Sequence, residues 1–408
     1  MPNVAFVAPF FLPTTLRFVR AAATLPGVEL GLISQDPPET LPDELRNRLA
    51  AHVRVPDALD PDRIREGVEN VTRELGPVTR LLGALEEIQV PLGEVRDALG
   101  IPGMGAGAAR NFRDKSRMKD VLRSAGLPCA RHALARTPAD AMAAAGDLGF
   151  PLIVKPPSGS GARRTFRIES PAQLADVLAT HPPSADRPSL LEEFVIGEEH
   201  SFDAVSIGGC VAWHSISHYL PSPLEVLREP WIQWCVLIPR ETDSPRYEGI
   251  RAVAGDVLRR LGMQTGLSHM EWFRRVDGTV AVSEVGARPP GAQFTTLISW
   301  AHDFDLYEAW ARLMVYGAFE PRPRPYAAGA AYLRGQGSGR VRRVTGLEAI
   351  LDELGPLCVE SRLPRAGQSP SGTYEGEGYI IVRHPRTSVV RDALERIVTR
   401  VRVELEAC

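Results

Sequence analysis

Two glutamates, Glu271 and Glu284, flank a stretch that the sequence predicts to be a tight hairpin. Asp277-Gly278 is a strong signal for a two-residue turn, because the runs on both sides of it are rich in β-forming residues. A turn of two residues fixes the register of the strands, and in that register Glu271 lies directly opposite Glu284. Two carboxylates about 5 Å apart on one face of a sheet repel each other unless a cation compensates them.

The same register makes further predictions about this hairpin. Val276 pairs with Thr279 beside the turn. Phe273 and Val282 share the face of the two glutamates, so that face is at least partly buried. Burial of two carboxylates is costly without a cation, and a divalent metal that prefers hard oxygen ligands, Mg²⁺ or Mn²⁺, would offset the cost. The alternatives are that one glutamate is protonated or that Arg288 forms an ion pair with it.

Other cationic residues are placed where they can meet phosphate groups. Lys155 ends a β-run and precedes a loop with Gly159, and glycines let backbone N–H groups approach anionic oxygens. The order of a P-loop, G-x-x-x-x-G-K-[ST], is absent, so a polar surface turn explains this loop equally well. Arg288 can bind phosphate oxygens through two N–H groups, or it forms a plain salt bridge.

A further group of cations crowds the start of a helix expected near residue 115. Cations are unfavourable at the positive end of a helix dipole. The cluster therefore indicates an anionic partner nearby, or else it is a solvated face. Its members are Arg113, Lys115, Arg117 and Lys119.

Two more segments are candidates for ligand binding. Residues 190–203 begin as an apolar strand and become acidic, so that backbone groups could meet an adenine edge and Glu199 could hold ribose hydroxyls; an exposed charged turn is the alternative. Residues 213–241 are rich in aromatic and histidine side chains and could line an amino-acid pocket, although ordinary packing explains each one singly. The candidates there are His214, His218, Tyr219, Trp231, Trp234 and Arg240, with Arg240 as a partner for a substrate carboxylate.

The elements that must position these residues follow from hydrophobic periodicity. Residues 3–11 and 28–34 are predicted strands with a helix over 16–25 between them, and residues 71–88 are predicted helical. This alternation is typical of an α/β domain with a parallel sheet. No G-x-G-x-x-G follows the first strand, so dinucleotide binding is unsupported.

A different pattern begins near residue 112 and continues to the end of the chain. A short helix ends at Gly126, paired strands over 197–220 turn at Gly208-Gly209, and a helix over 246–262 precedes the glutamate hairpin. A helical run over 299–317 and a Pro/Arg-rich linker follow, and the last 80 or so residues are expected to form a small α/β region.

Composition places the chain among ordinary globular proteins. Its 408 residues suffice for two or three domains, and a net charge of −3 gives no field that favours nucleic acid or an anionic membrane. The five cysteines are scattered without a C-x-x-C pair, which fits a reducing compartment and argues against a disulfide framework. The apolar start has no basic region and is interpreted as a strand rather than a signal peptide. A cytoplasmic location is expected.

Five segments, in this order, resemble the ATP-grasp superfamily: RDKSRMKDVLRSAGLP, FPLIVKPPSGSGARR, LLEEFVIGEE, HMEWF and VSEVGARPPG. The regions on either side look like those of carboxylate–amine ligases, including the L-amino-acid ligases. The resemblance implies a three-part α/β (α+β) architecture. The parts are an N-terminal parallel α/β domain over 1–110, an ATP-grasp domain over 111–320 with a small lobe at about 115–195 and a large lobe at about 196–320, and a C-terminal α/β subdomain over 325–408.

The resemblance also implies roles for individual positions. Glu271 and Glu284 would hold Mg²⁺ ions that bridge the phosphates of ATP. Arg288 would stabilise the acyl-phosphate and the tetrahedral intermediate, with Lys155 as a second catalytic residue. The positions implied to bind ATP are Lys115, Lys155, Ser158, Gly159, Ser160, Gly161, Glu192, Glu193, Phe194, Val195 and Glu199.

One position departs from the family pattern Glu-x-Asn-x-Arg, because Gly286 stands where the asparagine is expected. One metal ligand is therefore missing or is replaced by water or by His269, which lies opposite Gly286. The implied reaction phosphorylates a carboxylate and then forms an amide with an amine. A thiol or bicarbonate acceptor, or nucleotide binding without turnover, are the alternatives. The expected partners are two small molecules and, as in many relatives, a second copy of the chain in a homodimer, with neither nucleic acid nor membrane.

Overall fold

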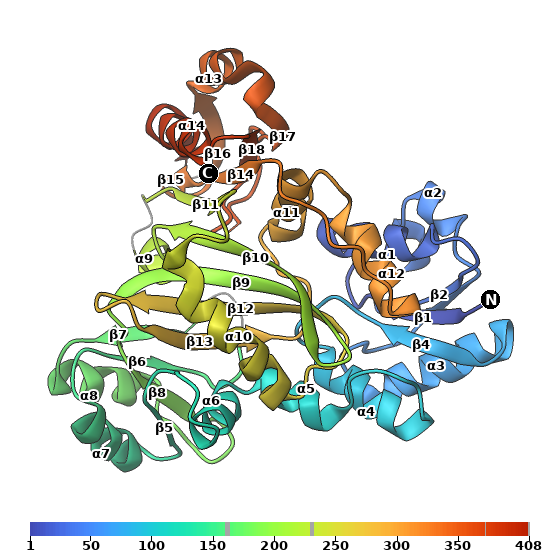
Figure 1. Ribbon diagram of the computed structural model, residues 1–408, viewed down its shortest axis with the longest axis horizontal. Helices are drawn as coiled ribbons and strands as arrows, with labels where there is room; N and C mark the ends of the chain where they lie inside the picture. The colour runs from blue at the N-terminus through green and yellow to red at the C-terminus, as the bar shows by residue number, and fades with distance from the viewer. Residues whose placement is uncertain (160–163, 229–231, 372, 407–408) are drawn as a thin grey trace.

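The computed structural model describes residues 1–159, 164–228, 232–371 and 373–406. The N-terminal region forms a parallel sheet with helices packed on it, as predicted (Figure 1). Its strands are β1 (Asn3–Val7), β2 (Glu29–Ser34), β3 (Ala51–Arg54) and β4 (Val78–Leu82), in the order β3-β2-β1-β4. Its helices are α1 (Pro13–Ala23), α2 (Asp43–Arg46), α3 (Pro61–Leu75), α4 (Gln89–Leu99) and α5 (Ala106–Arg113).

The prediction of a helix over 71–88 is wrong beyond Leu75. Helix α3 ends at Leu75 because Gly76 adopts φ +87° and Pro77 cannot continue the helical hydrogen bonding. Residues 78–82 then pair with β1 as a fourth parallel strand. In the order β3-β2-β1-β4, strands β2 and β3 lie on one side of β1, and the chain then crosses to place β4 on the other side. The crevice at such a switch point is where α/β sheets bind ligands. Glu86 lies in the loop that follows β4, at this crevice.

A small antiparallel sheet forms the next layer, in the order β5-β8-β6-β7, with α7 and α8 beside it (Figure 1). The loop after β6 leads away from Lys155, as the sequence indicated. The elements are α6 (Lys115–Ser124), β5 (His132–Ala135), α7 (Pro138–Leu148), β6 (Leu152–Lys155), β7 (Phe166–Ile168), α8 (Pro171–Thr180) and β8 (Ser189–Glu193).

The largest sheet is antiparallel and has eight strands, in the order β13-β12-β9-β10-β11-β14-β18-β17. The paired strands predicted around Gly208-Gly209 are its centre. Three strands from beyond residue 325 extend this same sheet, so the C-terminal region is continuous with the large lobe rather than separately stacked (Figure 1). The strands are β9 (Gly197–Ile207), β10 (Cys210–Leu220), β11 (Trp234–Ile238), β12 (Gly266–Arg275), β13 (Val280–Gly286), β14 (Ala327–Leu333), β17 (Cys358–Arg362) and β18 (Gly378–His384).

Helices cover both faces of this sheet. α10 (Glu248–Leu261) buries Ile250, Ala254, Val257 and Leu258 on one face, at the spacing of an amphipathic helix, and ends at Gly262 with φ +99°. The run predicted over 299–317 forms two helices, α11 (Phe294–His302) and α12 (Leu306–Tyr316). They lie in one apolar core with α1 and with β11 and β14, on the other face of the sheet.

The remaining elements complete the C-terminal end. α14 (Thr387–Arg400) packs on β14 and β18, and a three-stranded sheet stands beside it. None of the helices in the described part of the chain has both the length and the apolar character that crossing a bilayer requires. The other elements are α9 (Pro223–Arg228), β15 (Gly335–Gln336), β16 (Arg340–Thr345), α13 (Leu347–Leu354) and β19 (Arg402–Glu406).

The hairpin of β12 and β13 places Glu271 opposite Glu284, which confirms the predicted pair. The turn, however, is not the predicted one. The Arg275 N–H donates to Thr279 O at 2.8 Å, so the loop between the paired residues holds three residues and Val276 does not pair with Thr279. A register shift at Ser283, the extra residue in β13, compensates for the longer loop and restores the pairing of the glutamates.

The prediction that Phe273 and Val282 share one face of the hairpin is wrong, because the loop is longer than expected. Val282 pairs with Trp272 and is fully buried in the core beneath α10. Phe273 pairs with Ala281 and lines the cavity described below. The two residues therefore lie on opposite faces, because a shift of one residue turns every side chain to the other face.

Candidate active site

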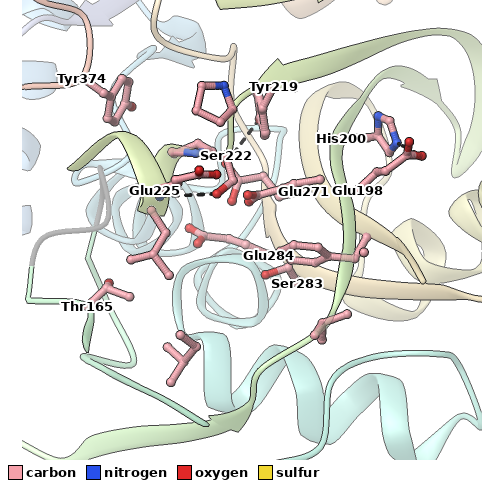
Figure 2. Close-up of a pocket in the computed structure, with 18 of the residues that line it drawn as sticks. Thr165, Glu198, His200, Tyr219, Ser222, Glu225, Glu271, Ser283, Glu284 and Tyr374 are labelled. Carbon is pink, nitrogen blue, oxygen red and sulfur yellow. Dashed lines mark hydrogen bonds and ion pairs between the residues drawn. The ribbon is translucent and has the colours of Figure 1, made fainter. Parts of the chain in front are cut away.

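A cavity of about 630 Å³ lies where the small sheet, the large sheet and the N-terminal region meet. Figure 2 shows Glu271 and Glu284 projecting into it from adjacent strands, with Tyr219 and Tyr374 nearby. Most of the chemically active residues predicted from the sequence line this one cavity. They are Lys115, Lys155, Gly159, Glu192, Glu193, Phe194, Val195, Glu199, His218, Tyr219, Trp234, His269, Glu271, Glu284 and Arg288.

Each of the opposed glutamates has a cationic neighbour. Lys115 Nζ lies 2.9 Å from Glu284 Oε1. His269 Nε2 lies 3.8 Å from Glu271 Oε1, and the Tyr219 hydroxyl donates to the same oxygen at 3.4 Å. Protein side chains therefore already offset part of the repulsion for which the sequence argument invoked a metal. Arg288 does not form the alternative ion pair with Glu271 or Glu284, because it binds Glu86 instead.

The pKa values of two carboxyl groups along this wall are shifted in opposite directions. Burial raises the pKa of Glu271, but the hydrogen bond and charge of His269 and the charges of Lys155 and Lys115 outweigh it and leave that pKa below the ordinary value. Burial and then the charge of Glu271 raise the pKa of Glu199 well above its ordinary value. The pKa values of these two neighbouring carboxyl groups are thus shifted in opposite directions, so Glu199 holds a proton more readily than Glu271. A protonated carboxyl both donates and accepts hydrogen bonds.

His269 lies between two carboxylates, those of Asp203 and Glu271. Its Nδ1 lies 2.6 Å from Asp203 Oδ1. Burial lowers the pKa of His269, but Asp203 and the bond to Glu271 outweigh burial and raise it to about 9. A protonated imidazole has no lone pair to offer a metal. His269 would have to lose a proton to bind a metal, and its replacement of the asparagine missing at Gly286 stays a prediction.

Glu271 and Glu284 fit Mg²⁺ as a two-carboxylate site. Their oxygens are hard ligands on adjacent strands, and both face the cavity. Among the described residues, no group of three or more His, Cys, Asp or Glu is arranged to hold a metal. An ion at this pair would need further oxygens from water and phosphate groups, which is the usual coordination of Mg²⁺ in nucleotide sites.

Glu192 is the counter-ion of two lysines, and its implied role in ATP binding stays a prediction. Lys155 Nζ lies 3.0 Å from Glu192 Oε2, and Lys119 Nζ lies 3.4 Å from Oε1. Lys119 is fully buried and also donates to Ser283 O at 2.9 Å, at the irregularity that sets the register of Glu284. Sequence reasoning placed Lys119 in the cationic cluster but gave it no role.

The first residues of the predicted phosphate loop, which follows β6, contact the start of α6. Lys115 Nζ donates to Gly159 O at 3.0 Å, and the Lys115 N–H donates to Pro157 O at 2.8 Å. Ser158 is exposed and does not line the cavity. Ser160 and Gly161 lie outside the described residues. The loop therefore starts beside the lysines that were predicted to meet phosphates.

The predicted adenine segment borders the cavity at the end of β8. The Glu193 carboxylate is held by Arg131 at 2.9 Å and by Arg275 at 2.7 Å. The Arg167 guanidinium lies 4.1 Å from the centre of the Phe194 ring, and Val195 is buried. These contacts fix the segment, and its adenine role stays a prediction.

The residues predicted to line a substrate pocket are only partly found at the cavity. His214 does not line the cavity; it stacks on Phe202, which belongs to the core beneath α10. Side chains alternate along a strand, so His214 and Tyr219 of β10 point to opposite faces. Arg240 is exposed and donates to Pro385 O at 3.3 Å, away from the cavity. Trp231 lies outside the described residues.

Glu86 was not predicted from the sequence. Its Oε2 accepts from Arg288 at 2.6 and 3.0 Å, and its Oε1 accepts from Arg113 at 2.9 Å. Burial raises the pKa of Glu86, but the charges of Arg288, Lys115 and Arg113 outweigh it and keep that pKa below the ordinary value. Tyr374, from the C-terminal region, was also missed. The sequence signal that could have indicated Glu86 is its position just after β4, at the switch point of the sheet. That signal was lost because the residues of β4 were predicted to be helical.

Comparison with known proteins agrees with this geometry. The family model of the ATP-grasp domain matches residues 120–301. The chain carries an ATP-grasp domain. The ATP-grasp chain is 26% identical over 277 residues to the L-arginine-specific L-amino acid ligase of Bacillus subtilis, a match of 67% of this chain and 66% of that protein. It is 39% identical over 205 residues to a D-alanine–D-alanine ligase of Stutzerimonas stutzeri (strain A1501), which covers 47% of this chain and 61% of that one.

The matched segments amount to just under two thirds of these relatives' own lengths. The crystal structure of an L-amino acid ligase from Bacillus licheniformis superposes with a TM-score of 0.80 at 20% identity, over 100% of this chain and 99% of the other. The ATP-grasp fold and the resemblance to ligases of the L-amino-acid ligase type are therefore confirmed.

Proposed function

We propose that this ATP-grasp chain is an ATP- and magnesium-dependent ligase that joins the carboxylate of one amino-acid-like substrate to the amine of another. The observation that carries the proposal is the Glu271–Glu284 pair in one cavity with Lys115, Lys155 and Arg288. Phosphoryl transfer needs little from a protein beyond such positioning and charge stabilisation. The relatives named as L-amino acid and D-alanine–D-alanine ligases support amino acids as the substrates.

The lysines provide the positive charge for a bound triphosphate. Lys155 is held by Glu192, and burial lowers its pKa while Glu192, Glu284 and Glu271 outweigh burial and raise it, so it stays charged. Lys115 contacts Glu284 and can exchange that contact for a phosphate oxygen, because both would lie within its reach. A magnesium ion held by Glu271 and Glu284 would neutralise the charge of the transferring phosphoryl group.

In the proposed reaction a substrate carboxylate oxygen bonds to the γ-phosphorus, and the bond from that phosphorus to the bridging oxygen of ADP breaks. A neutral amine then attacks the acyl carbon, the C–O bond to phosphate breaks, and the nitrogen loses a proton. Negative charge develops on the acyl oxygen in the second step. Arg288 is partly buried, permanently charged and oriented by Glu86, so it can stabilise that charge without rearrangement.

Several aromatic residues from distant segments close one end of the cavity. Tyr219 and Trp234 lie on the large sheet, Phe294 opens α11 and Tyr374 comes from the C-terminal region. An apolar wall with a few polar groups is the usual form of a small-molecule site. We place the side chain of one substrate there.

We also propose a division of the chain that rests on its resemblance to these ligases. The parts are an N-terminal domain over 1–110, a grasp domain over 111–320 and a C-terminal part over 325–408.

The direct test is to measure ADP and phosphate release with pairs of amino acids as substrates, followed by mass detection of the dipeptide. Release that requires two amino acids and yields an amide supports the proposal. Release with a thiol or with bicarbonate indicates a different acceptor. ATP binding without release under any acceptor indicates a nucleotide-binding protein without this activity.

A further inference from the structure

A second cavity, of about 300 Å³, lies on the other side of the segment that carries Arg288. Its walls come from the end of β4, from α4, from the start of β12 and from α12, which Figure 1 shows at the junction of the N-terminal region and the large lobe. No Asp or Glu occurs among the described residues that line it. Its charged and polar side chains are Arg80, Arg96, Arg288, Gln89, Gln264 and Thr265.

Arg96 is a buried cation whose hydrogen-bond partners are carbonyl groups. It is 5% exposed, and it donates to Leu81 O at 2.6 and 3.2 Å and to Met104 O at 3.0 Å. Within the described part of the chain no carboxylate forms an ion pair with it, and the nearby Asp97 accepts instead from the Ala106 N–H at 2.9 Å. A buried charge without a counter-ion is costly, so an anion in the cavity would be stabilised.

The backbone is shaped around this arginine. Gly103 adopts φ +148°, and a Cβ built there would lie 2.9 Å from Arg96 Cδ. Arg80 is half-buried, and its described hydrogen bond is to the carbonyl of its neighbour Thr79. Arg288 is neutralised by Glu86. Two of the three arginines at the cavity thus lack a carboxylate partner among the described residues.

The opposite wall of the cavity is apolar. Its side chains are Met263, Leu267, Trp310, Leu313 and Met314. The volume is at the lower end of the range for ligand sites, which fits a molecule of about the size of an amino acid. A ligand with an ammonium group would find no lining carboxylate to receive it, so the chemistry selects an anion with an apolar chain.

We propose that this second cavity binds a small organic carboxylate that has a short apolar chain and no ammonium group. The carboxylate would meet Arg96 and Arg80, and the chain would pack on Trp310 and Met314. Arg288 lines both cavities, so the occupant would touch the segment that holds Arg288 against Glu86. This site is separate from the cavity of the proposed reaction and does not depend on that reaction.

The test uses calorimetry on the full chain with 4-methylpentanoate and its uncharged isostere, 4-methylpentanamide. The proposal predicts saturable binding of one carboxylate per chain and binding of the amide that is weaker by about tenfold or more, because the amide lacks the charge-assisted hydrogen bonds. No turnover is needed for this measurement. Equal affinities for acid and amide, or no saturable binding of the acid at about 10 mM, would overturn the proposal.

Two variants locate the bound carboxylate. Arg80→Gln should weaken binding by about tenfold, and Met314→Trp, at a partly exposed position, should fill the cavity and abolish it. Neither residue lines the first cavity. Arg73→Gln, which removes an exposed arginine from α3, is the matched control and should leave binding unchanged. Wild-type affinity in both Arg80→Gln and Met314→Trp would show that the carboxylate binds elsewhere.

Discussion

Glu86 and Arg288 are 202 positions apart in the chain, yet they form two hydrogen bonds of 2.6 and 3.0 Å at the wall of the main cavity. One residue belongs to the N-terminal region and the other follows the glutamate hairpin. The pair therefore joins two parts of the protein at the residue proposed to stabilise the acyl intermediate.

Replacement of Glu86 by Gln should destabilise the protein and lower its activity. Removing one partner of a buried ion pair leaves the other charge uncompensated, at a cost of about 3–5 kcal/mol. Urea unfolding measures this loss. Glu94→Gln breaks the more exposed ion pair with Arg110 and should cost at most about 1 kcal/mol. Equal free energies of unfolding for the two variants would show that the Glu86 contact contributes little.

Lys119 is predicted to position Glu284 without touching substrate. In Lys119→Met, Ser283 O loses its donor at the register shift and Glu192 loses one of its two cations. We expect the magnesium concentration needed for half-maximal ATP turnover to rise by about 10–100-fold, as for other residues that support metal ligands. A titration with Mg²⁺ at saturating ATP measures it. A variant that is merely less stable would keep the wild-type half-maximal concentration.

Acid should destabilise the fold through four histidines, three of them buried and His214 partly buried. Burial, aided by nearby charges, lowers the pKa of His200 and His214 to about 4, of His302 to about 3 and of His218 to about 2. Below about pH 6.5 the unfolded chain binds protons that the folded chain does not, so the free energy of unfolding falls as the pH drops from about 6.5 towards 4. Each histidine contributes up to about 1.4 kcal/mol per pH unit.

Urea unfolding at pH 7, 6 and 5 measures this dependence. His214→Phe removes one titrating group, so its pH dependence should be shallower by up to about 1.4 kcal/mol per pH unit. A free energy of unfolding that stays constant or increases as the pH is lowered from 7 to 5 would contradict the interpretation that these histidines are neutral in the folded protein.

The parts of the site that the sequence predicted are those with a local signal. The glutamate pair was found because a short turn fixes the register of its flanking strands, although two offsets of one residue, at the turn and at Ser283, had to cancel. Helix α6 and its lysines were found because the apolar spacing indicates a helix and Gly126 marks its end. The parallel N-terminal sheet followed from alternating hydrophobic runs.

The parts that the sequence did not predict depend on contacts between distant segments. Nothing near Glu86 in the chain indicates that Arg288 is its partner, and the run around it has the composition of a helix. His214 and Arg240 were assigned to a pocket from the density of aromatic residues alone, which does not say which face of a strand each one occupies. Lys119 and Glu192 carry charges that a sequence argument places at the surface, and they are buried because they neutralise each other.

The most direct test of the proposed function is ADP release by Glu284→Gln as a function of Mg²⁺. The variant keeps the size of the side chain but removes one of the two opposed charges, so the fold should persist by circular dichroism while Mg²⁺-dependent turnover falls by about 100-fold or more. Glu395→Gln, at an exposed position of α14, should turn over ATP like the wild type. Turnover by Glu284→Gln at the wild-type rate and Mg²⁺ dependence would contradict the assignment of the glutamate pair as the metal site.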